Sequence, residues 1–224
     1  MTHAVLLHPH FAHGGDQHNR VISAVYDRLV GGPVTPHRFN FSSPADTVAC
    51  SEATAQVEAC GGPVVLVGYS FGGDIAARVT HPAVTGWALI APALVVPQFV
   101  SPASPFRLPP PPPIASDPRP KLVAAAERDA WFGPDVLDPL TSGWAACTRR
   151  TVPDADHFFS ATTDLVADLV AGWVVEHATA VAAGLWRPRV VPAWLAGPST
   201  AAGSSRPRCS WRRRWGWPAS PSPR

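Results

Sequence analysis

The sequence lacks several features that would place the protein in a membrane or a disulfide-bonded class. None of its apolar runs approaches the ~18 residues of a membrane-spanning helix, so we expect no transmembrane segment. The start passes directly into the apolar run Ala4–Leu7 without the basic and long apolar regions of a signal peptide, which favours a cytoplasmic location. No C-x-x-C pair occurs, so neither a zinc site nor a redox pair is indicated. Cys50 and Cys60 are too far apart along a predicted helix to bridge, and we expect free thiols.

Acidic residues are absent from the last part of the chain. Residues 1–185 contain all 16 acids and 10 of the 18 basic residues, a net charge of −6, whereas residues 186–224 contain eight arginines and no acid. This stretch is rich in Pro, Arg, Ser, Gly and Trp without periodicity, which predicts a disordered basic tail. Interleaved Arg and Trp are compatible with a nucleic acid or an anionic membrane surface. The simpler interpretation, a solvated tail without such a contact, is favoured.

Residues 64–79 have the pattern of a site for nucleophilic catalysis. Val64–Val67 has the apolar, β-branched composition of a buried strand, and the G-x-S-x-G turn 68–72 follows it. Asp74–Val79 then has a helical pattern. A serine between a strand and a helix in this motif is the context of a nucleophile elbow, which predicts Ser70 as a nucleophile. An ordinary turn that happens to contain a serine is the alternative.

Strand-like and helix-like segments alternate along the chain, which predicts a mostly parallel sheet with helices on both faces. The expected strands are Ala4–Leu7, Val34–Phe41, Val64–Val67, Gly86–Ile90, Lys121–Ala126 and Thr148–Val152. The expected helices are 21–30, Asp46–Cys60, Asp74–Val79, Gly133–Leu140 and Phe159–Val175, the last with Leu165, Leu169 and Trp173 on its apolar face. We therefore assign residues 1–178 to one α/β domain with about six strands and 186–224 to the tail. Within the domain, the proline-rich segment 93–120 is expected to be extended or irregular and to form at most a minimal cap.

A nucleophilic serine needs a base, and the base needs an orienting acid. In this type of architecture the chain order is nucleophile, acid, histidine. Asp129 follows the strand Lys121–Ala126, and His157 follows the last strand, so these are the predicted acid and base. Glu127 is the alternative acid. His81 is the alternative base, although it ends the helix after the elbow, far from the carboxyl edge of the sheet.

The predicted site also needs donors for a developing oxyanion. The backbone N–H of Phe71, directly after the nucleophile, is one predicted donor. The loop after the first strand should supply the second, and the N–H of Phe11 is the best candidate. We place His10 and Tyr69 on the substrate side of the site.

The same loop could also be interpreted as a metal cluster. Its candidate ligands are His8, His10, His13, Asp16 and His18. Their spacing matches no metal-binding helix, and Pro9 with Gly14-Gly15 makes the loop irregular. We therefore expect no metal and no other cofactor.

With these residues identified, the chain resembles the α/β-hydrolase superfamily over residues 4–175. It looks most similar to the small bacterial hydrolases of the dienelactone-hydrolase and prolyl-oligopeptidase-like branch. The motifs that carry the resemblance are His8-Pro9-His10 with Gly14-Gly15 and Asn19, Arg38-Phe39-Asn40-Phe41, Gly68-Tyr69-Ser70-Phe71-Gly72-Gly73, Asp129 and Asp156-His157-Phe158-Phe159. The resemblance implies an α/β-hydrolase sheet and a triad of Ser70, Asp129 and His157. Four features depart from the family pattern. The first strand begins almost at Ala4, without the strand pair that usually precedes it, and Ser42-Ser43-Pro44 stands in place of a glycine-rich turn. The proline-rich segment replaces the cap, and the tail has no counterpart.

The sequence thus predicts a serine hydrolase that cleaves a carboxylic ester or a related acyl bond of a small molecule through an acyl-enzyme. A non-catalytic binding protein on the same fold is the main alternative, and a nucleic-acid-associated protein acting through the tail is a further one. The identity of the substrate and the oligomeric state do not follow from the sequence.

Overall fold

The computed structural model describes residues 1–95 and 110–185, apart from the side chain of His13. The described chain forms a sheet of six parallel strands in the order β2-β1-β3-β4-β5-β6. The strands are β1 (Thr2–Leu7), β2 (Val34–Arg38), β3 (Val64–Tyr69), β4 (Val84–Ile90), β5 (Lys121–Ala126) and β6 (Cys147–Val152). The expected α/β class and strand number are confirmed. The predicted tail, and residues 96–109 of the proline-rich segment, lie outside the described residues.

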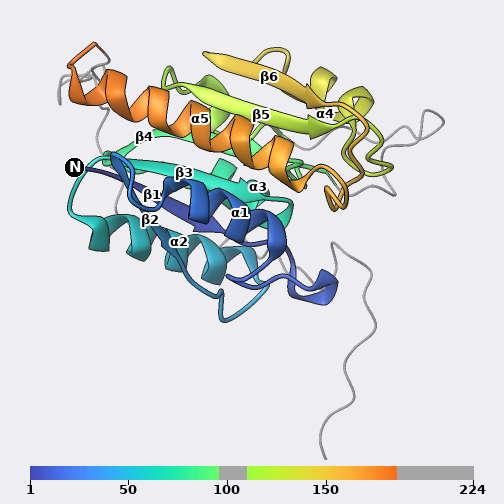
Figure 1. Ribbon diagram of the computed structural model, residues 1–224, viewed down its shortest axis with the longest axis horizontal. Helices are drawn as coiled ribbons and strands as arrows, with labels where there is room; N and C mark the ends of the chain where they lie inside the picture. The colour runs from blue at the N-terminus through green and yellow to red at the C-terminus, as the bar shows by residue number, and fades with distance from the viewer. Residues whose placement is uncertain (96–109, 186–224) are drawn as a thin grey trace, which may run out of the picture.

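Helices cover both faces of this sheet (Figure 1). The helices are α1 (Arg20–Leu29), α2 (Asp46–Cys60), α3 (Phe71–Arg78), α4 (Pro134–Thr141) and α5 (Thr163–Ala182), with short 3-10 turns η1 (Phe11–His13) and η3 (Pro113–Ser116). Helices α1 and α5 pack on one face, and α2, α3 and α4 pack on the other. Arg28 of α1 binds both Asp164 and Asp168 of α5, so an ion-pair cluster joins the two helices at the surface.

The strand order creates a switch point between β1 and β3. The chain leaves β1 toward α1 on one face and leaves β3 toward α3 on the other, so the two loops diverge at the carboxyl edge. Such a divergence opens the space in which ligands of parallel α/β sheets bind. The elbow serine and the loop after β1 both lie at this edge.

Two local expectations were wrong. β2 ends at Arg38, before the expected limit at Phe41. The segment 93–120 is also not wholly extended or irregular, because Pro113 begins the 3-10 turn η3. Proline is tolerated at the first position of a helix, since its fixed φ fits and its missing N–H has no partner there.

Helix α5 differs from expectation in both its limits and its buried face. It runs from Thr163 to Ala182, and Val166, Val170 and Val174 face the core. The face predicted to be buried, with Leu165, Leu169 and Trp173, lies at the edge of the contact with the sheet instead. Leu165 is 53% exposed. Small and branched side chains let the helix approach the sheet closely, whereas larger ones remain at its flank.

Helix α5 is also long and apolar enough to cross a membrane by length and composition alone, although the sequence contains no uninterrupted apolar run of that length. In this fold one side of it packs against the sheet. Core helices of this kind meet the same criterion, so its hydropathy is explained by packing.

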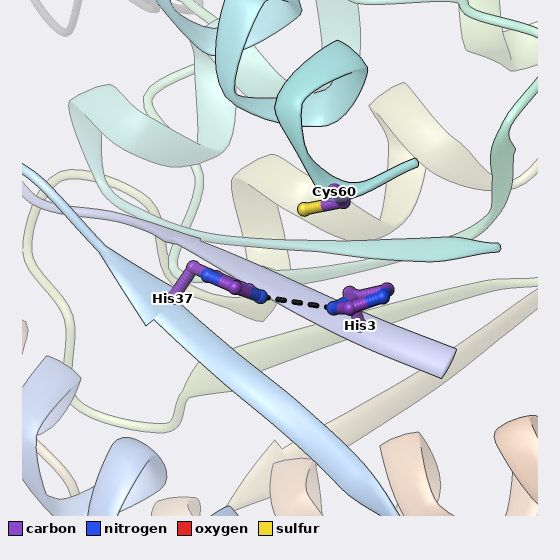
Figure 2. Close-up of side chains that lie close together, drawn as sticks. All are labelled: His3, His37 and Cys60. Atoms are coloured by element: carbon purple, nitrogen blue, oxygen red, sulfur yellow. Dashed lines mark hydrogen bonds between the residues drawn. The ribbon is translucent and has the colours of Figure 1, made fainter. Parts of the chain in front are cut away.

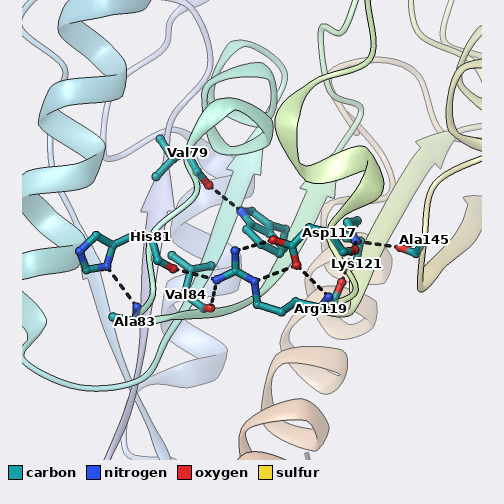
Figure 3. A network of polar contacts seen from close by, with 9 residues as sticks. Val79, His81, Ala83, Val84, Asp117, Arg119, Lys121 and Ala145 are labelled. Carbon is teal, nitrogen blue, oxygen red and sulfur yellow. Dashed lines mark hydrogen bonds and ion pairs between the residues drawn. The ribbon is translucent and has the colours of Figure 1, made fainter. Parts of the chain in front are cut away.

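A buried polar network closes the opposite, amino-terminal edge of the sheet (Figure 3). Lys121, the only lysine in the sequence, is fully buried at the start of β5. Its ammonium group donates to the carbonyl oxygens of Asp117, of Arg119 (2.7 Å) and of Ala145 (2.7 Å). Arg119 also lies over the ring of Trp87, 4.5 Å from its centroid. All three ammonium donors are therefore satisfied, as a buried charge requires.

Candidate active site

Ser70 occupies a strained backbone position at the end of β3. Its φ and ψ are 52° and −112°, a conformation that L-residues rarely adopt and that costs about 1–3 kcal/mol. Its N–H donates to the carbonyl of Ile90 at 2.9 Å, and its own carbonyl accepts the N–H groups of Gly73 and Asp74 in the first turn of α3. The strain is therefore held by bonds to the neighbouring strand and the following helix.

Two glycines make this turn sterically possible. A Cβ atom at Gly68 would lie 2.2 Å from the carbonyl oxygen of Gly72. A Cβ atom at Gly72 would lie 2.2 Å from the carbonyl oxygen of Leu7, the last residue of β1. Only glycine permits approaches this close. Gly72 therefore brings the start of α3 against the loop that follows β1.

Asp129 and His157 meet Ser70 at the carboxyl edge of the sheet. The Nε2 atom of His157 lies 3.2 Å from the Oγ atom of Ser70, and its Nδ1 atom lies 2.6 Å from Oδ2 of Asp129. All three residues are buried, with Ser70 9% exposed. An imidazole that donates from Nδ1 to the carboxylate has its Nε2 lone pair available for the serine hydroxyl proton. The structure thus brings together the three residues expected to form the triad.

The acid and the histidine are each positioned by further bonds. Oδ1 of Asp129 accepts the backbone N–H groups of Trp131 (2.8 Å) and Phe132 (3.0 Å), so Oδ2 faces the imidazole. The Tyr69 hydroxyl donates to the carbonyl oxygen of His157 at 2.8 Å. The predicted place of Tyr69 on the substrate side is wrong, because the residue is only 2% exposed. Burial also raises the pKa of its phenol. Its hydroxyl contacts the backbone that carries the predicted base.

The alternative acid and base occupy other positions. Glu127 accepts the backbone N–H of Asp154 at 2.7 Å with its Oε2 atom. His81 accepts the N–H of Ala83 at 3.1 Å in the turn before β4, at the amino-terminal edge of the sheet. Arg128, the sequence neighbour of Asp129, pairs with Asp154.

The loop after β1 lies beside the elbow. The rings of His10 and Phe71 have centroids 5.5 Å apart, and Nδ1 of His10 accepts the N–H of Ala12 at 3.2 Å. Phe11 begins η1 directly after His10 and is 37% exposed. The two predicted oxyanion donors therefore come from segments that are in contact, one on each side of the switch point.

His8 holds this loop in place through two hydrogen bonds that the sequence does not indicate. Its Nδ1 atom lies 2.7 Å from the carbonyl oxygen of Pro9, and its Nε2 atom accepts the N–H of Phe41 at 3.0 Å. This arrangement requires the neutral Nδ1–H tautomer. Burial lowers the pKa of His8, which favours the same neutral form. Both ring nitrogens are thus occupied in joining the loop after β1 to the segment after β2.

Among the loop side chains that the structure describes, those of His8, His10, Asp16 and His18 form no group of three close metal ligands. Asp16 uses one carboxylate oxygen to accept the N–H of His18, a local turn contact at 2.6 Å. Within residues 1–95 and 110–185, the one cluster of three close potential metal ligands lies at a different place, on β1, β2 and α2.

Two exposed aromatic side chains flank the imidazole. Trp131 and Phe158 are 38% and 42% exposed, and their ring centroids lie 5.0 and 5.4 Å from that of His157. They also contact each other edge to face at 5.7 Å. This aromatic pair is not predicted by any motif in the sequence, although each member lies within two residues of Asp129 or His157.

Comparisons with solved structures define the fold. No protein-family model matches the sequence, and no curated protein matches it significantly. Among similar structures, an α/β serine hydrolase homologue from Coxiella burnetii is 19% identical, with 77% of this chain and 85% of that chain covered at a TM-score of 0.64. A lidless α/β serine hydrolase from Xanthomonas campestris is 23% identical, with 75% and 78% covered at 0.59. Est1E from Butyrivibrio proteoclasticus is 14% identical, with 80% and 88% covered at 0.65.

The chain accordingly has the α/β-hydrolase fold, as the sequence motifs had implied. The narrower placement near dienelactone hydrolases and prolyl-oligopeptidase-like enzymes is supported by none of these comparisons and stays a prediction.

Proposed function

We propose that the protein is a serine hydrolase that cleaves a carboxylic ester or a related acyl bond through an acyl-enzyme. The observation that carries the proposal is the continuous hydrogen-bonded chain from Asp129 through His157 to Ser70, with the serine on a strained elbow. A hydroxyl becomes nucleophilic when an oriented base can take its proton. The similarity to structures described as serine hydrolases and esterases supports the same class.

Each group has a defined part in the proposed reaction. Ser70 Oγ bonds to the acyl carbon while its proton passes to Nε2 of His157. Asp129 stabilises the resulting imidazolium and holds its orientation. The proton then goes to the leaving alcohol, and a water molecule repeats the sequence to release the acid. The backbone N–H groups of Phe71 and Phe11 are the proposed donors to the oxyanion of each tetrahedral intermediate.

The substrate side of the proposal rests on the aromatic pair beside the imidazole. The exposed rings of Trp131 and Phe158 offer apolar, flat surface next to the reacting atoms, which favours a planar or aromatic group on the substrate. Est1E from Butyrivibrio proteoclasticus has been solved with ferulic acid, an aromatic acid, bound to it. We therefore propose small aryl or arylacyl esters as the first substrates to examine.

A fluorophosphonate probe tests the proposal because it forms a phosphorus–oxygen bond only with an activated serine and releases fluoride. The wild-type chain should be labelled once, at Ser70, and should hydrolyse p-nitrophenyl esters. Ser70→Ala and His157→Ala should lose labelling and lower turnover at least ~10³-fold. Ser51→Ala, at an exposed position of α2, is the matched control and should change neither. Turnover by Ser70→Ala near the wild-type rate would refute the proposal, and an unlabelled, inactive wild-type chain would favour a non-catalytic binding protein.

A further inference from the structure

Three potential metal ligands from different elements converge at the amino-terminal part of the sheet. They are His3 on β1, His37 on β2 and Cys60, the last residue of α2 (Figure 2). One ligand atom from each lies within 4.8 Å of the other two. The Nδ1 atom of His3 and the Nε2 atom of His37 are 2.9 Å apart. The three residues are far apart in sequence and are brought together only by the tertiary fold.

Strand register explains why the two imidazoles share a face. His37 is paired with Val5, and His3 lies two residues before Val5 on the same strand. Side chains two residues apart on a strand point to the same face, and paired residues on neighbouring strands do as well. Val5 contributes to the core beneath α2, so both histidines point toward that helix.

Helix geometry places the thiol on the same side. Val57 of α2 is buried in the core cluster that contains Val5. Cys60 lies three residues further along the helix and therefore on nearly the same face. Gly61 ends the helix in a left-handed conformation directly after the cysteine. The cysteine is a free thiol, and its Sγ atom lies 3.2 Å from the carbonyl oxygen of Gln56.

The contact between the imidazoles is itself informative. A hydrogen bond between two rings requires that one of the facing nitrogens be an unprotonated acceptor. A lone pair thus already points into the space between the rings. The three side chains are partly rather than fully buried, so an ion has access from solvent.

We propose that His3, His37 and Cys60 form a binding site for a thiophilic divalent transition-metal ion, with Zn²⁺ as the expected occupant. Imidazole nitrogens and thiolates are both zinc ligands, and three protein ligands with a water molecule in the fourth position make a tetrahedral open site. Zinc–nitrogen and zinc–sulfur bonds of about 2.0 and 2.3 Å require nitrogens about 3.3 Å apart. The rings therefore need to separate by only a few tenths of an ångström, while the sulfur moves inward.

The proton balance of binding is simple. In the hydrogen-bonded pair one of the two facing nitrogens carries a proton. That ring exchanges this proton with solvent and takes one up on its outer nitrogen, so each neutral imidazole keeps one N–H on the side away from the metal. The Cys60 thiol loses its proton to solvent as the sulfur–metal bond forms. No electron transfer is involved.

The site is remote from the proposed active site. His3 is paired with Val64, the first residue of β3, whereas Ser70 follows the last. His37 is paired with Val5, which is paired with Leu66, so the cluster lies four to six strand residues, about 13–20 Å, from the level of Ser70. Metal binding is therefore expected to leave basal hydrolysis unchanged, and the inference stands or falls independently of the proposed function.

The test uses the full-length chain without an affinity tag. Zn²⁺ binding is measured by competition with a chromophoric chelator, and Co²⁺ serves as the spectroscopic probe because a thiolate ligand adds a near-ultraviolet charge-transfer band. We expect one Zn²⁺ per chain, a Co²⁺–thiolate band, and a rise in Tm of several degrees with Zn²⁺. Cys60→Ser and His37→Gln should each weaken Zn²⁺ binding at least ~100-fold, as loss of a direct ligand does, and Cys60→Ser should abolish the band.

Cys50→Ser is the matched control, since it removes another partly buried free thiol from the same helix. It should retain the stoichiometry, the affinity and the band. Circular dichroism and hydrolysis of a p-nitrophenyl ester report whether each variant is folded. Zn²⁺ binding that is equally tight in wild type, Cys60→Ser and His37→Gln would overturn the proposal, because the ion would then be held elsewhere. So would a wild-type chain that shows no tight binding or no thiolate band.

Discussion

The replacement Asp129→Asn tests the proposed mechanism most sharply, because the structure dictates how the new amide must lie. In the wild type, one carboxylate oxygen accepts two backbone N–H groups, from Trp131 and Phe132, and the other faces Nδ1 of His157. An asparagine that keeps its oxygen on the two N–H donors must turn its NH₂ group toward His157. Reversing the amide would oppose an NH₂ group to two N–H donors and would lose both bonds.

This orientation changes the state of the base. An NH₂ group donates, so Nδ1 of His157 becomes the acceptor and the imidazole proton moves to Nε2. That nitrogen then has no lone pair for the Ser70 hydroxyl, although the heavy-atom positions barely change. An isosteric amide in such a triad lowers kcat about 10⁴-fold, equivalent to about 5.5 kcal/mol in the activation free energy.

The assay is hydrolysis of p-nitrophenyl acetate, with urea unfolding as the measure of stability. Glu127→Gln is the matched control, since this neighbouring acid contacts the backbone of Asp154 and should leave kcat within about twofold. Asp129→Asn should remain folded because its two backbone bonds are retained. A kcat within tenfold of wild type in the folded Asp129→Asn protein would refute the reasoning.

Three further predictions concern stability and substrate preference. Lys121→Met leaves buried carbonyl oxygens without their donor and should lower the free energy of unfolding by about 3 kcal/mol in urea titrations, whereas a change below 1 kcal/mol would contradict the account of that network. Because burial lowers the pKa of folded His8 below 6.5, the unfolded chain binds more protons, so stability should fall as the pH drops below about 6.5. His8→Leu should cost about 1 kcal/mol at pH 8 through the lost bond from Phe41, and the difference from wild type should shrink toward pH 5; a constant difference would exclude the neutral histidine. Trp131→Ala should raise KM several-fold for a p-nitrophenyl benzoate but little for the acetate, and an equal change for both esters would argue against an aromatic contact.

The positions of the proposed catalytic residues were accessible from sequence because each follows a strand within a short local pattern. An apolar β-branched run ending in G-x-S-x-G specifies a strand, a tight turn and a helix through contacts between near neighbours. Asp129 and His157 could then be placed because parallel strands end at one common edge. The sequence pattern and the expected parallel topology were sufficient to predict that Ser70, Asp129 and His157 lie close together. They did not give the distances between these side chains or their protonation states.

Other features depended on contacts between distant segments. The buried face of α5 could not be predicted from side-chain size, since close packing against the sheet placed Val166 and Val170 inside and left Leu165 outside. The partners of Tyr69 and His8 are 88 and 33 residues away along the chain, and no local periodicity records such separations.

By itself, the sequence determined the alternation of strands and helices, the elbow and the order of the predicted nucleophile, acid and base, because these follow from backbone propensity and local spacing. Only the tertiary structure decided which oxygen of Asp129 faces the imidazole. It alone also brought His3, His37 and Cys60 to one face of the sheet. Strand register and the packing of helices on the sheet determine these contacts. Both depend on burial of the whole core rather than on any single segment of the sequence.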